Sequence, residues 1–441
     1  MRTLSDWVKK LSKDSFTIDC PSMALRGFSD HESPILEGSG SLEIKGRESI
    51  LFTMHALPGD GAEAFKKLAA SANHPYDIKA QFRLFAIDYE QTEWACGWTS
   101  PQIKATTKNR WLLIGALSGL TTCLSGNRVS KISSAEIVLC PGPHVPLGET
   151  LIETASIGQE EIGKKISGGR HKCRVLGAEI EIEREPWTDN LWIVSTTSAE
   201  LQHPFLENWL SEPLGVLCGE FVYPRLVARN FGDGRAFISL RPSPILPQKI
   251  PGYASRFLRE GNFTDQFWDF YSRYLRYIAK SRSPNGSPNF ETNTITRFYE
   301  EIMQAAQSSR WVLSLGLASA IEGIAKILAK PEEMVSDFSS QDLDAIQKHI
   351  KSWKGPPEVR QRFLFEVSHL RKRTIGSYLG KLIQEKVISQ DHLNAWTDIR
   401  HEVMHGGLGI PWPNESRDEK IEKLLELLHI LTEKLVNDWN Q

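Results

Sequence analysis

The chain has 441 residues, more than one hydrophobic core usually organises, so we expect at least two domains. Apolar residues make up 40% of the sequence and charged residues 24%, which is ordinary for a soluble globular protein. The formal net charge of −2 excludes a protein that coats nucleic acid non-specifically, so any nucleic-acid site must be local.

Processing and membrane signals are missing from the expected places. Residues 1–14 lack the apolar region and small-residue cleavage site of a signal peptide. The most apolar run, residues 111–124, is too short to span a bilayer and contains Gly, Ser and Thr. The six cysteines form no C-x-x-C pair, which favours reduced thiols over a disulfide framework or a zinc ribbon. We therefore expect a cytoplasmic protein with no membrane segment.

Residues 1–245 carry the alternation of apolar and polar residues that is typical of β-strands. The alternation is clearest in residues 42–54, 78–89 and 178–197. Two stretches, residues 61–72 and 204–210, instead have helical spacing. This part of the chain is predicted to be a β-rich domain, either a sandwich or barrel-like.

A proline- and glycine-rich segment, residues 241–252, interrupts both periodicities and marks the domain boundary. Residues 246–290 are predicted to be a linker that contains one connecting helix, at residues 264–279. The aromatic residues of this helix have a spacing that fits a core or a dimer face better than a base-stacking surface.

Residues 291–441 are predicted to be all-helical. The expected helices cover residues 294–329, 340–353, 357–369, 375–386, 390–405 and 418–439. Ser340 and Ser389 are expected to cap two of them. The predicted fold class is therefore α+β and multidomain, with a β-rich domain followed by an all-α helical bundle.

The segment Arg400–His405 carries the strongest chemical signal. Residues 401–405 spell H-E-x-x-H, in which two histidines bind zinc and the glutamate acts as general base. A zinc hydrolase needs a third ligand, but Pro411 stands where the usual third histidine would be, and Leu408 where the usual glycine would be. The helix is also expected to end at Gly406 and Gly407, directly after the second histidine. The remaining acidic candidates fit the solvated face of the last helix. They are Glu415, Glu419, Glu422 and Glu426.

Taken from Arg400, the same segment is R-x4-H, with the polar His401 directly after the arginine. It resembles the R-x4-6-H signature of HEPN ribonucleases, all-helical domains that cleave RNA without a metal. In that family an earlier long helix carries an acidic residue that faces the motif, and Glu322 matches this residue. The layout, a β-rich region before the bundle, resembles that of ApeA-type abortive-infection proteins.

The resemblance implies a metal-independent endoribonuclease with no cofactor, acting as a homodimer or larger assembly through its helical domain. Arg400 and His405 would be catalytic, with His401 and Glu322 accessory to the site. The biological role would be bacterial antiviral defence by abortive infection, a toxin restrained by residues 1–245 until a phage-derived trigger binds there.

RNA cleavage by its own 2′-hydroxyl gives this pattern a physical reason. The reaction needs proton transfer at two oxygens and positive charge on the phosphorane between them. His405, in the last helical turn, lies where the helix dipole favours its protonated form. Arg400 offers a planar fork of donors for phosphate oxygens. The basic run Arg371, Lys372 and Arg373 is a candidate substrate contact, although a solvated face explains such a run as well.

Other interpretations stay open at this stage. Arg400 can simply pair with Asp398 or Glu402, and Glu322 can form a structural ion pair. The bundle can then be a non-catalytic HEPN-like module that binds RNA or a protein. A zinc hydrolase that uses residues 401–405 is the remaining alternative.

Overall fold

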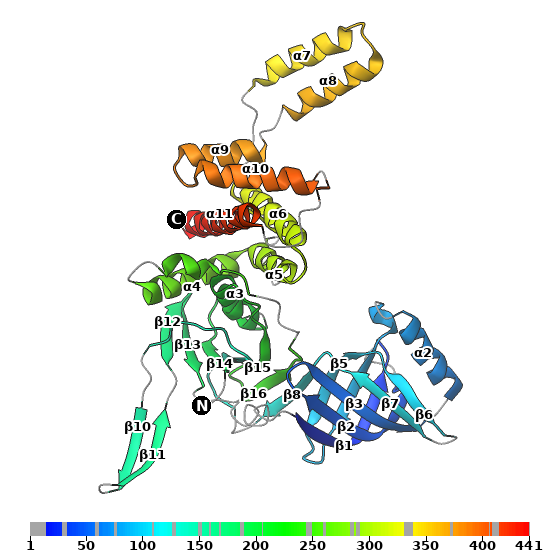
Figure 1. The fold of residues 1–441 in the computed structure, drawn as a ribbon. Helices are drawn as coiled ribbons and strands as arrows, with labels where there is room; N and C mark the ends of the chain where they lie inside the picture. Colours follow the sequence, from blue (N-terminus) through cyan, green and yellow to red (C-terminus); the bar gives the residue numbers. More distant parts are fainter. Residues whose placement is uncertain are drawn as a thin grey trace. The chain divides into compact units, whose positions relative to one another are not determined.

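The structure is a computed structural model. It describes residues 15–28, 33–57, 61–74, 77–107, 110–125, 129–148, 152–157, 160–166, 169–185, 189–204, 206–243, 249–258, 262–282, 286–287, 292–329, 338–370, 374–404, 406–407 and 414–440. The chain divides into two compact units (Figure 1). The first comprises Met1–Leu246 with Phe257–Thr292, and the second comprises Pro247–Arg256 with Asn293–Gln441.

Fourteen strands of the described part of the first unit form one antiparallel sheet. They are β1 (Ser15–Arg26), β2 (Leu36–Lys45), β3 (Ser49–Leu57), β4 (Phe82–Ile87), β5 (Glu93–Thr99), β6 (Gln102–Thr106), β7 (Trp111–Ala116), β8 (Leu120–Ser125), β9 (Ser134–Leu139), β12 (Arg170–Val175), β13 (Ala178–Arg184), β14 (Leu191–Thr196), β15 (Pro224–Asn230) and β16 (Arg235–Leu240). Their order in the sheet is β12-β13-β14-β9-β15-β16-β8-β5-β4-β1-β2-β3-β7-β6. A separate hairpin joins β10 (Ile152–Ile157) to β11 (Glu160–Ile166).

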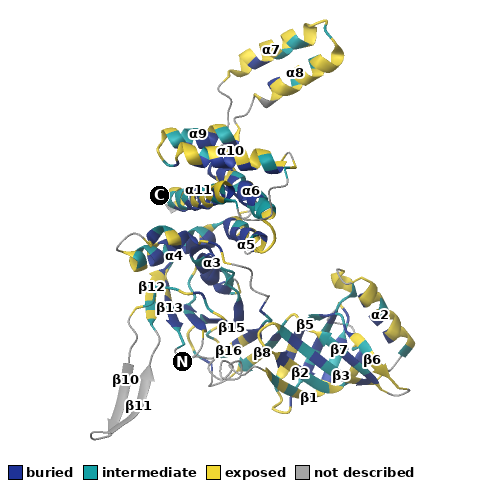
Figure 2. Ribbon diagram, in the orientation of Figure 1, coloured by how far each residue is buried: buried dark blue, intermediate teal, exposed yellow. Residues whose placement is uncertain are grey.

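Alternation along the strands builds the core of this unit, as predicted from the sequence. In β3, Ile50, Phe52 and Met54 are buried while the residues between them are more exposed. The turn that joins β2 to β3 contains Gly46 with φ of +60°, a conformation that favours glycine. Figure 2 shows the buried residues concentrated in the sheet. The prediction of a β-rich region is confirmed.

At one end of the sheet order, β12 carries cations at alternate positions. Arg170, Lys172 and Arg174 are all exposed along this edge strand. Arg170 and Lys172 both form ion pairs with Glu181 of β13, at 2.9 and 3.4 Å. The outward face of the edge is therefore charged along its length.

Among the described residues of the first unit are the α-helices α2 (Gly61–Asn73), α3 (Leu206–Cys218) and α4 (Phe263–Lys280). We had assigned the α4 segment to the linker, but it packs against α3 and β12 and belongs to the first unit. Trp268 of α4 stacks on His171 at 4.0 Å and donates a hydrogen bond from Nε1 to Pro146 O at 2.8 Å. Its aromatic face thus lies in a core, in line with its spacing.

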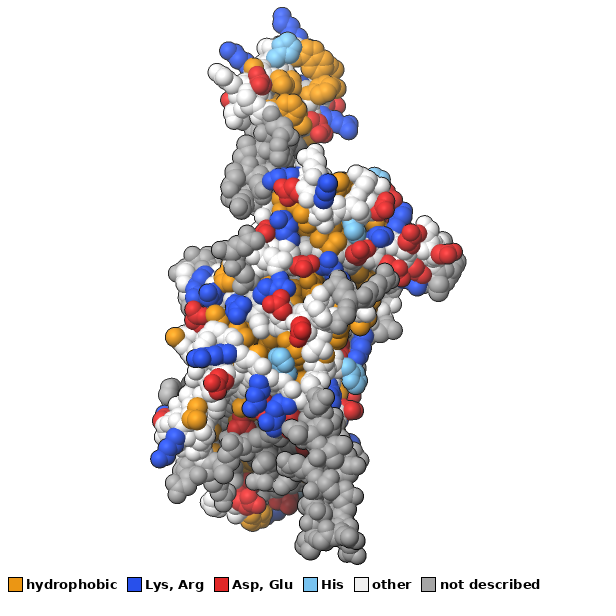
Figure 3. Space-filling view, turned by 90° about the vertical axis from the view of Figure 1, so that its left-hand side faces the viewer, with side chains coloured by type: hydrophobic (Ala, Val, Ile, Leu, Met, Phe, Trp, Pro, Cys, Tyr) orange, Lys and Arg blue, Asp and Glu red, His pale blue; other side chains and the backbone are white. Residues whose placement is uncertain are grey.

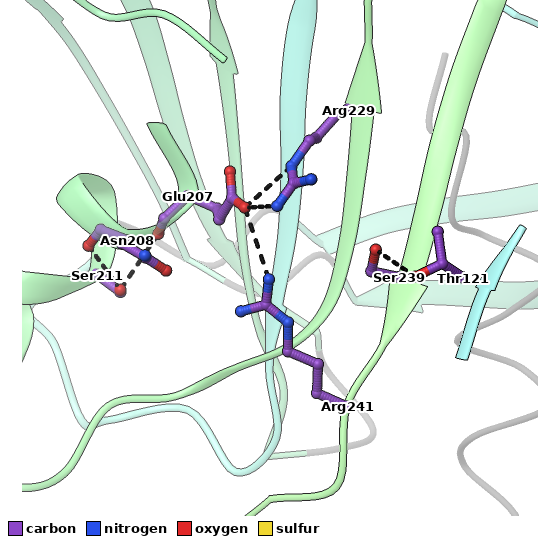
Figure 4. A network of polar contacts seen from close by, with 7 residues as sticks. All are labelled: Thr121, Glu207, Asn208, Ser211, Arg229, Ser239 and Arg241. Atoms are coloured by element: carbon purple, nitrogen blue, oxygen red, sulfur yellow. Dashed lines mark hydrogen bonds and ion pairs between the residues drawn. The ribbon is translucent and has the colours of Figure 1, made fainter. Parts of the chain in front are cut away.

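A buried carboxylate links α3 to the sheet (Figure 4). The side chain of Glu207 is 1% exposed, and its Oε1 accepts hydrogen bonds from Nε and Nη2 of Arg229. Arg241 Nη2 lies 3.8 Å from the same oxygen. Two guanidinium groups therefore compensate a charge that burial alone would disfavour.

The second unit is helical in its described part. Its helices are α5 (Thr294–Ala306), α6 (Arg310–Leu328), α7 (Ser340–Ser352), α8 (Pro357–His369), α9 (Ile375–Gln384), α10 (Gln390–Met404) and α11 (Glu415–Asn440). A short 3-10 turn, Tyr253–Phe257, lies at the junction of the two units. The two-part α+β layout is therefore present, with a large antiparallel sheet followed by helices.

Two details of the helical prediction were wrong. The single helix expected over residues 294–329 is two helices, because Ser309 interrupts it and caps α6 by accepting a hydrogen bond from Val312 N. The cap of α7 is Ser339 rather than Ser340, and its hydroxyl accepts from Asp342 N at 3.0 Å. Serine competes with the helix through its own side chain, so a run of serines leaves the boundary ambiguous by a residue.

Helix α6 lies at the centre of the bundle and packs against α5, α9, α10 and α11. It is the one helix in the described residues that is long and apolar enough to cross a membrane. Length and composition alone select it, and core helices pass the same test.

Candidate active site at the end of helix α10

Helix α10 ends at Met404, close to where the sequence predicted. Gly406 has φ of +73°, and Gly407 N donates to Glu402 O at 2.9 Å. Gly406 N donates to Val403 O at 3.4 Å, which completes the pattern of a Schellman cap. The predicted stop at this pair of glycines is confirmed. His405, the second residue of the R-x4-H pattern, lies outside the described residues.

Arg400 of α10 contacts Glu322 of α6. Arg400 Nε donates a hydrogen bond to Glu322 Oε2 at 3.2 Å, so an acidic residue of the earlier long helix does reach the arginine. Glu322 also binds Lys326, one turn further along α6, at 2.7 Å. One carboxylate therefore joins two cations at the α6–α10 contact.

Trp396 of α10 also contacts Arg400. The guanidinium carbon of Arg400 lies 5.5 Å from the centroid of the Trp396 ring, a cation–π arrangement. Trp396 is itself buried and donates from Nε1 to Ala318 O of α6 at 3.3 Å. Arg400 is thus held between a carboxylate and an indole that both depend on α6.

The electrostatics leave the arginine available to an anion. Lys326 lowers the pKa of Glu322 most, and Arg400 lowers it further against the opposing effect of burial, so Glu322 is a carboxylate at neutral pH. Arg400 remains 44% exposed, and its two Nη groups make no hydrogen bond within the described residues. These donors form the planar edge of the guanidinium that suits a phosphate.

The neighbouring acids that sequence alone offered as partners of Arg400 bind other cations. Asp398 accepts from Lys420 Nζ of α11 at 2.8 Å. Glu402 accepts from Arg417 Nη1, also of α11, at 2.8 Å. The described contacts therefore favour Glu322 as the partner of Arg400 over either local acid.

The H-E-x-x-H interpretation has weak geometric support. Glu402 would have to be a free general base, but its carboxylate is engaged by Arg417. The acidic residues proposed as a third ligand are all exposed along α11: Glu415, Glu419, Glu422 and Glu426. Within the described residues, which leave out His405, no three His, Cys, Asp or Glu side chains are grouped as a metal site.

Of the remaining predicted site residues, the structure describes His401 but not the basic run. His401 is exposed on α10, adjacent in sequence to Arg400. Arg371, Lys372 and Arg373 lie outside the described residues. Sequence reasoning missed Lys326 and Trp396, although each lies four residues from its partner, Glu322 or Arg400, a spacing that places side chains together on a helix.

Comparisons with protein-family models, with curated proteins and with solved structures gave no match to this chain.

Proposed function

We propose that the protein is a metal-independent endoribonuclease of the HEPN type. The observation that carries the proposal is the contact between Arg400 and Glu322 at 3.2 Å. It joins the motif helix to an acidic residue of an earlier helix, which is the relationship that the family resemblance implies. The R-x4-H pattern and the capped end of α10 agree with it.

In the proposed reaction, the 2′-oxygen of a ribose attacks the adjacent phosphorus, and the bond from phosphorus to the 5′-oxygen breaks. His405 takes part in moving the proton from the 2′-hydroxyl to the leaving 5′-oxygen, while the Nη groups of Arg400 stabilise the negative charge of the phosphorane. The products are a cyclic phosphate and a 5′-hydroxyl. Glu322 and Trp396 position Arg400 and do not touch the substrate.

A second copy of the chain completes this proposal. Positions five apart on a helix project about 140° from one another, so Arg400 and His405 of one helix do not aim at a single phosphate. Two motif helices that face each other would build a composite site from both chains. By the same resemblance, the first unit restrains the nuclease until a phage-derived trigger binds, and cleavage of cellular RNA in the cytoplasm then aborts the infection.

The test is cleavage of total RNA by purified full-length protein in excess EDTA. We compare wild type with Arg400→Ala and His405→Ala. Lys420→Ala is the matched control for Arg400, because it removes another ion pair of α10. His74→Ala, an exposed histidine just after α2, is the control for His405.

We expect cleavage to survive EDTA, to fall at least about a hundredfold in both site variants, and to persist in both controls. Cleavage that EDTA abolishes would instead support the zinc hydrolase. RNA that binds to wild type and to both site variants without being cut would support either a non-catalytic HEPN-like module or a nuclease that the first unit still restrains.

A further inference from the structure

Helices α7 and α8 form a hairpin with little core of its own. They pack against each other, and Leu343 and Val367 are its buried apolar residues. Several large apolar side chains are exposed instead (Figure 2). They are Phe338, Ile346, Trp353, Val359, Phe363, Phe365 and Leu370. Two helices alone bury too little surface to explain so many apolar residues by packing.

The charges of the hairpin are segregated along its length. Near the loop that joins the helices lie five cations: Lys348, Lys351, Lys354, Arg360 and Arg362. The acidic residues Asp342, Asp344 and Glu366 lie toward the opposite end, and Glu358 is the one acidic residue of the described hairpin near the loop. We call this cationic end, residues 348–363, the hairpin tip.

Most of the tip cations are unpaired. Within the described residues, Lys348, Lys351, Lys354 and Arg362 make no hydrogen bond or ion pair, whereas Arg360 donates to a backbone carbonyl. Many cations elsewhere in the described part of the second unit are bound to carboxylates: Arg310, Lys326, Arg400, Arg417, Lys420, Lys423 and Lys434. The tip thus carries five cations and one carboxylate, Glu358, in a chain whose net charge is −2.

Two aromatic rings are presented among these cations. Trp353 and Phe363 are 43% and 52% exposed, and their centroids lie 6.2 Å apart in an edge-to-face arrangement. The Trp353 ring lies across Gly355, where an added Cβ would come within 2.3 Å of it. Arg360 Nη1 donates to Trp353 O at 3.3 Å. The indole therefore packs against the backbone of Gly355 and the edge of Phe363 while much of its surface stays exposed.

We propose that the hairpin tip binds single-stranded RNA. Exposed aromatic rings stack on bases, and unpaired cations beside them follow the phosphates, which is how proteins bind single strands without reading sequence. An apolar protein partner would explain the exposed apolar residues, but it would not explain the four unpaired cations beside them. In the space-filling view, hydrophobic and basic side chains lie together on the surface of the hairpin (Figure 3, top). The inference rests on the proposed function: the hairpin tip would bind the RNA substrate at a site separate from Arg400.

Binding is measured apart from cleavage. The full-length His405→Ala protein is titrated in EDTA into a fluorescein-labelled oligouridine of about 20 nucleotides, and anisotropy is followed at several salt concentrations. The tip variant adds Lys348→Gln, Lys351→Gln and Arg362→Gln. The matched control removes three cations from α11 instead, by Lys420→Gln, Lys423→Gln and Lys434→Gln. Trp353→Leu tests stacking while keeping apolar volume, and Trp353→Tyr retains a ring.

We expect the tip variant to weaken binding at least about tenfold and to lower the slope of log Kd against log salt by about 2. Trp353→Leu should weaken binding roughly tenfold, with recovery in Trp353→Tyr. The control should bind like the parent. RNA binding that is unchanged in both the tip variant and Trp353→Leu, with helical circular dichroism intact, would overturn the proposal and assign the exposed face to a protein.

The same measurement separates this inference from the proposed nuclease. Loss of binding in the tip variant supports the RNA site whether or not the wild type cuts RNA, because a nuclease that is still restrained can bind its substrate. Cleavage that depends on Arg400, together with full binding in the tip variant, would reject the RNA site alone.

Discussion

Arg417 Nη1 donates a hydrogen bond to Glu402 Oε1 at 2.8 Å, so the glutamate inside the H-E-x-x-H pattern is tied to the last helix. Arg417 is almost fully buried, whereas Glu402 is partly exposed. The carboxylate therefore compensates a charge that the bundle has removed from water. The interhelical ion pair thus gives the glutamate of the H-E-x-x-H pattern a structural role.

Glu402→Ala is expected to destabilise the protein while leaving RNA cleavage in place. Removing the partner of a buried guanidinium costs about 1–3 kcal/mol of unfolding free energy, measured by urea denaturation. Glu422→Ala, which alters an exposed residue of α11, is the control and should change little. A stable Glu402→Ala protein that has lost its activity would show instead that this carboxylate is the general base of a metal enzyme.

Glu322→Ala tests whether Arg400 must be positioned. Without the carboxylate, the guanidinium keeps its charge but loses its hydrogen bond, so we expect RNA cleavage to fall by roughly ten- to a hundredfold. Lys326→Ala removes the other partner of Glu322 and leaves the Arg400 contact, so its effect on cleavage should be much smaller. Equal loss of activity in the two variants would contradict a positioning role.

The pH dependence of Glu322 has a definite sign. Its pKa is lowered in the folded chain, first by Lys326 and then by Arg400. The stabilisation is therefore present above the ordinary glutamate pKa of about 4.3 and is lost as the pH falls through the folded value. Cleavage that depends on this pair should decline on that acidic side in wild type, with the decline absent from Glu322→Ala.

His429 of α11 gives a second, separable dependence on pH. It stacks on Tyr299 at 5.9 Å, and burial, aided by the nearby Arg256, lowers its pKa to about 3. The unfolded chain therefore binds this proton more readily, so stability is complete above a pH of about 6.5 and declines as the pH falls toward the folded pKa.

Wild type should accordingly lose about 2 kcal/mol of stability from this group between about pH 7 and pH 5. His429→Phe keeps a ring against Tyr299 but cannot titrate, so its unfolding free energy should depend less on pH over this range. Parallel pH curves for wild type and His429→Phe would contradict the assignment.

Arg225 of β15 holds the turn between β2 and β3. Its side chain is 2% exposed, and it donates to Gly46 O at 2.9 Å and to Arg47 O. Arg225→Met should cost about 2–4 kcal/mol, because the carbonyls lose their donor in a buried site. Arg235→Met, which alters an exposed residue of β16, should leave the urea midpoint unchanged. If the urea midpoints of Arg225→Met and Arg235→Met are the same, the buried guanidinium of Arg225 does not stabilise the turn.

Many strands and helices could be predicted from the spacing of apolar residues alone. Strand β3 and helix α10 were predicted because alternation and helical spacing report which side of an element is buried. Gly406 was predicted to end α10 because few residues other than glycine adopt its φ of +73°. These signals are local, so one sequence is enough to reveal them.

Long-range pairing was beyond such signals. The single sheet depends on β5 meeting β8 and on β16 meeting β8, and nothing in the alternation of a strand names its partner. The sequence pattern of helix α4 shows that it is a helix but not that it packs against α3, so the sequence placed it in the linker. Arg400 and Glu322 were brought together only through a family resemblance, since 78 residues separate them in sequence.

The charged side chains of edge strand β12 affect how readily the protein aggregates at high concentration. An edge strand offers backbone groups that another sheet can pair with, and such pairing seeds aggregates. Arg170, Lys172 and Arg174 lie along this edge, and a strand added beside them would take part of their charged side chains out of water. Glu179, Glu181 and Glu183 of β13 lie opposite these cations, so the charges are locally balanced. The cost of desolvating the charged side chains, rather than repulsion between like charges, therefore disfavours the addition of a strand.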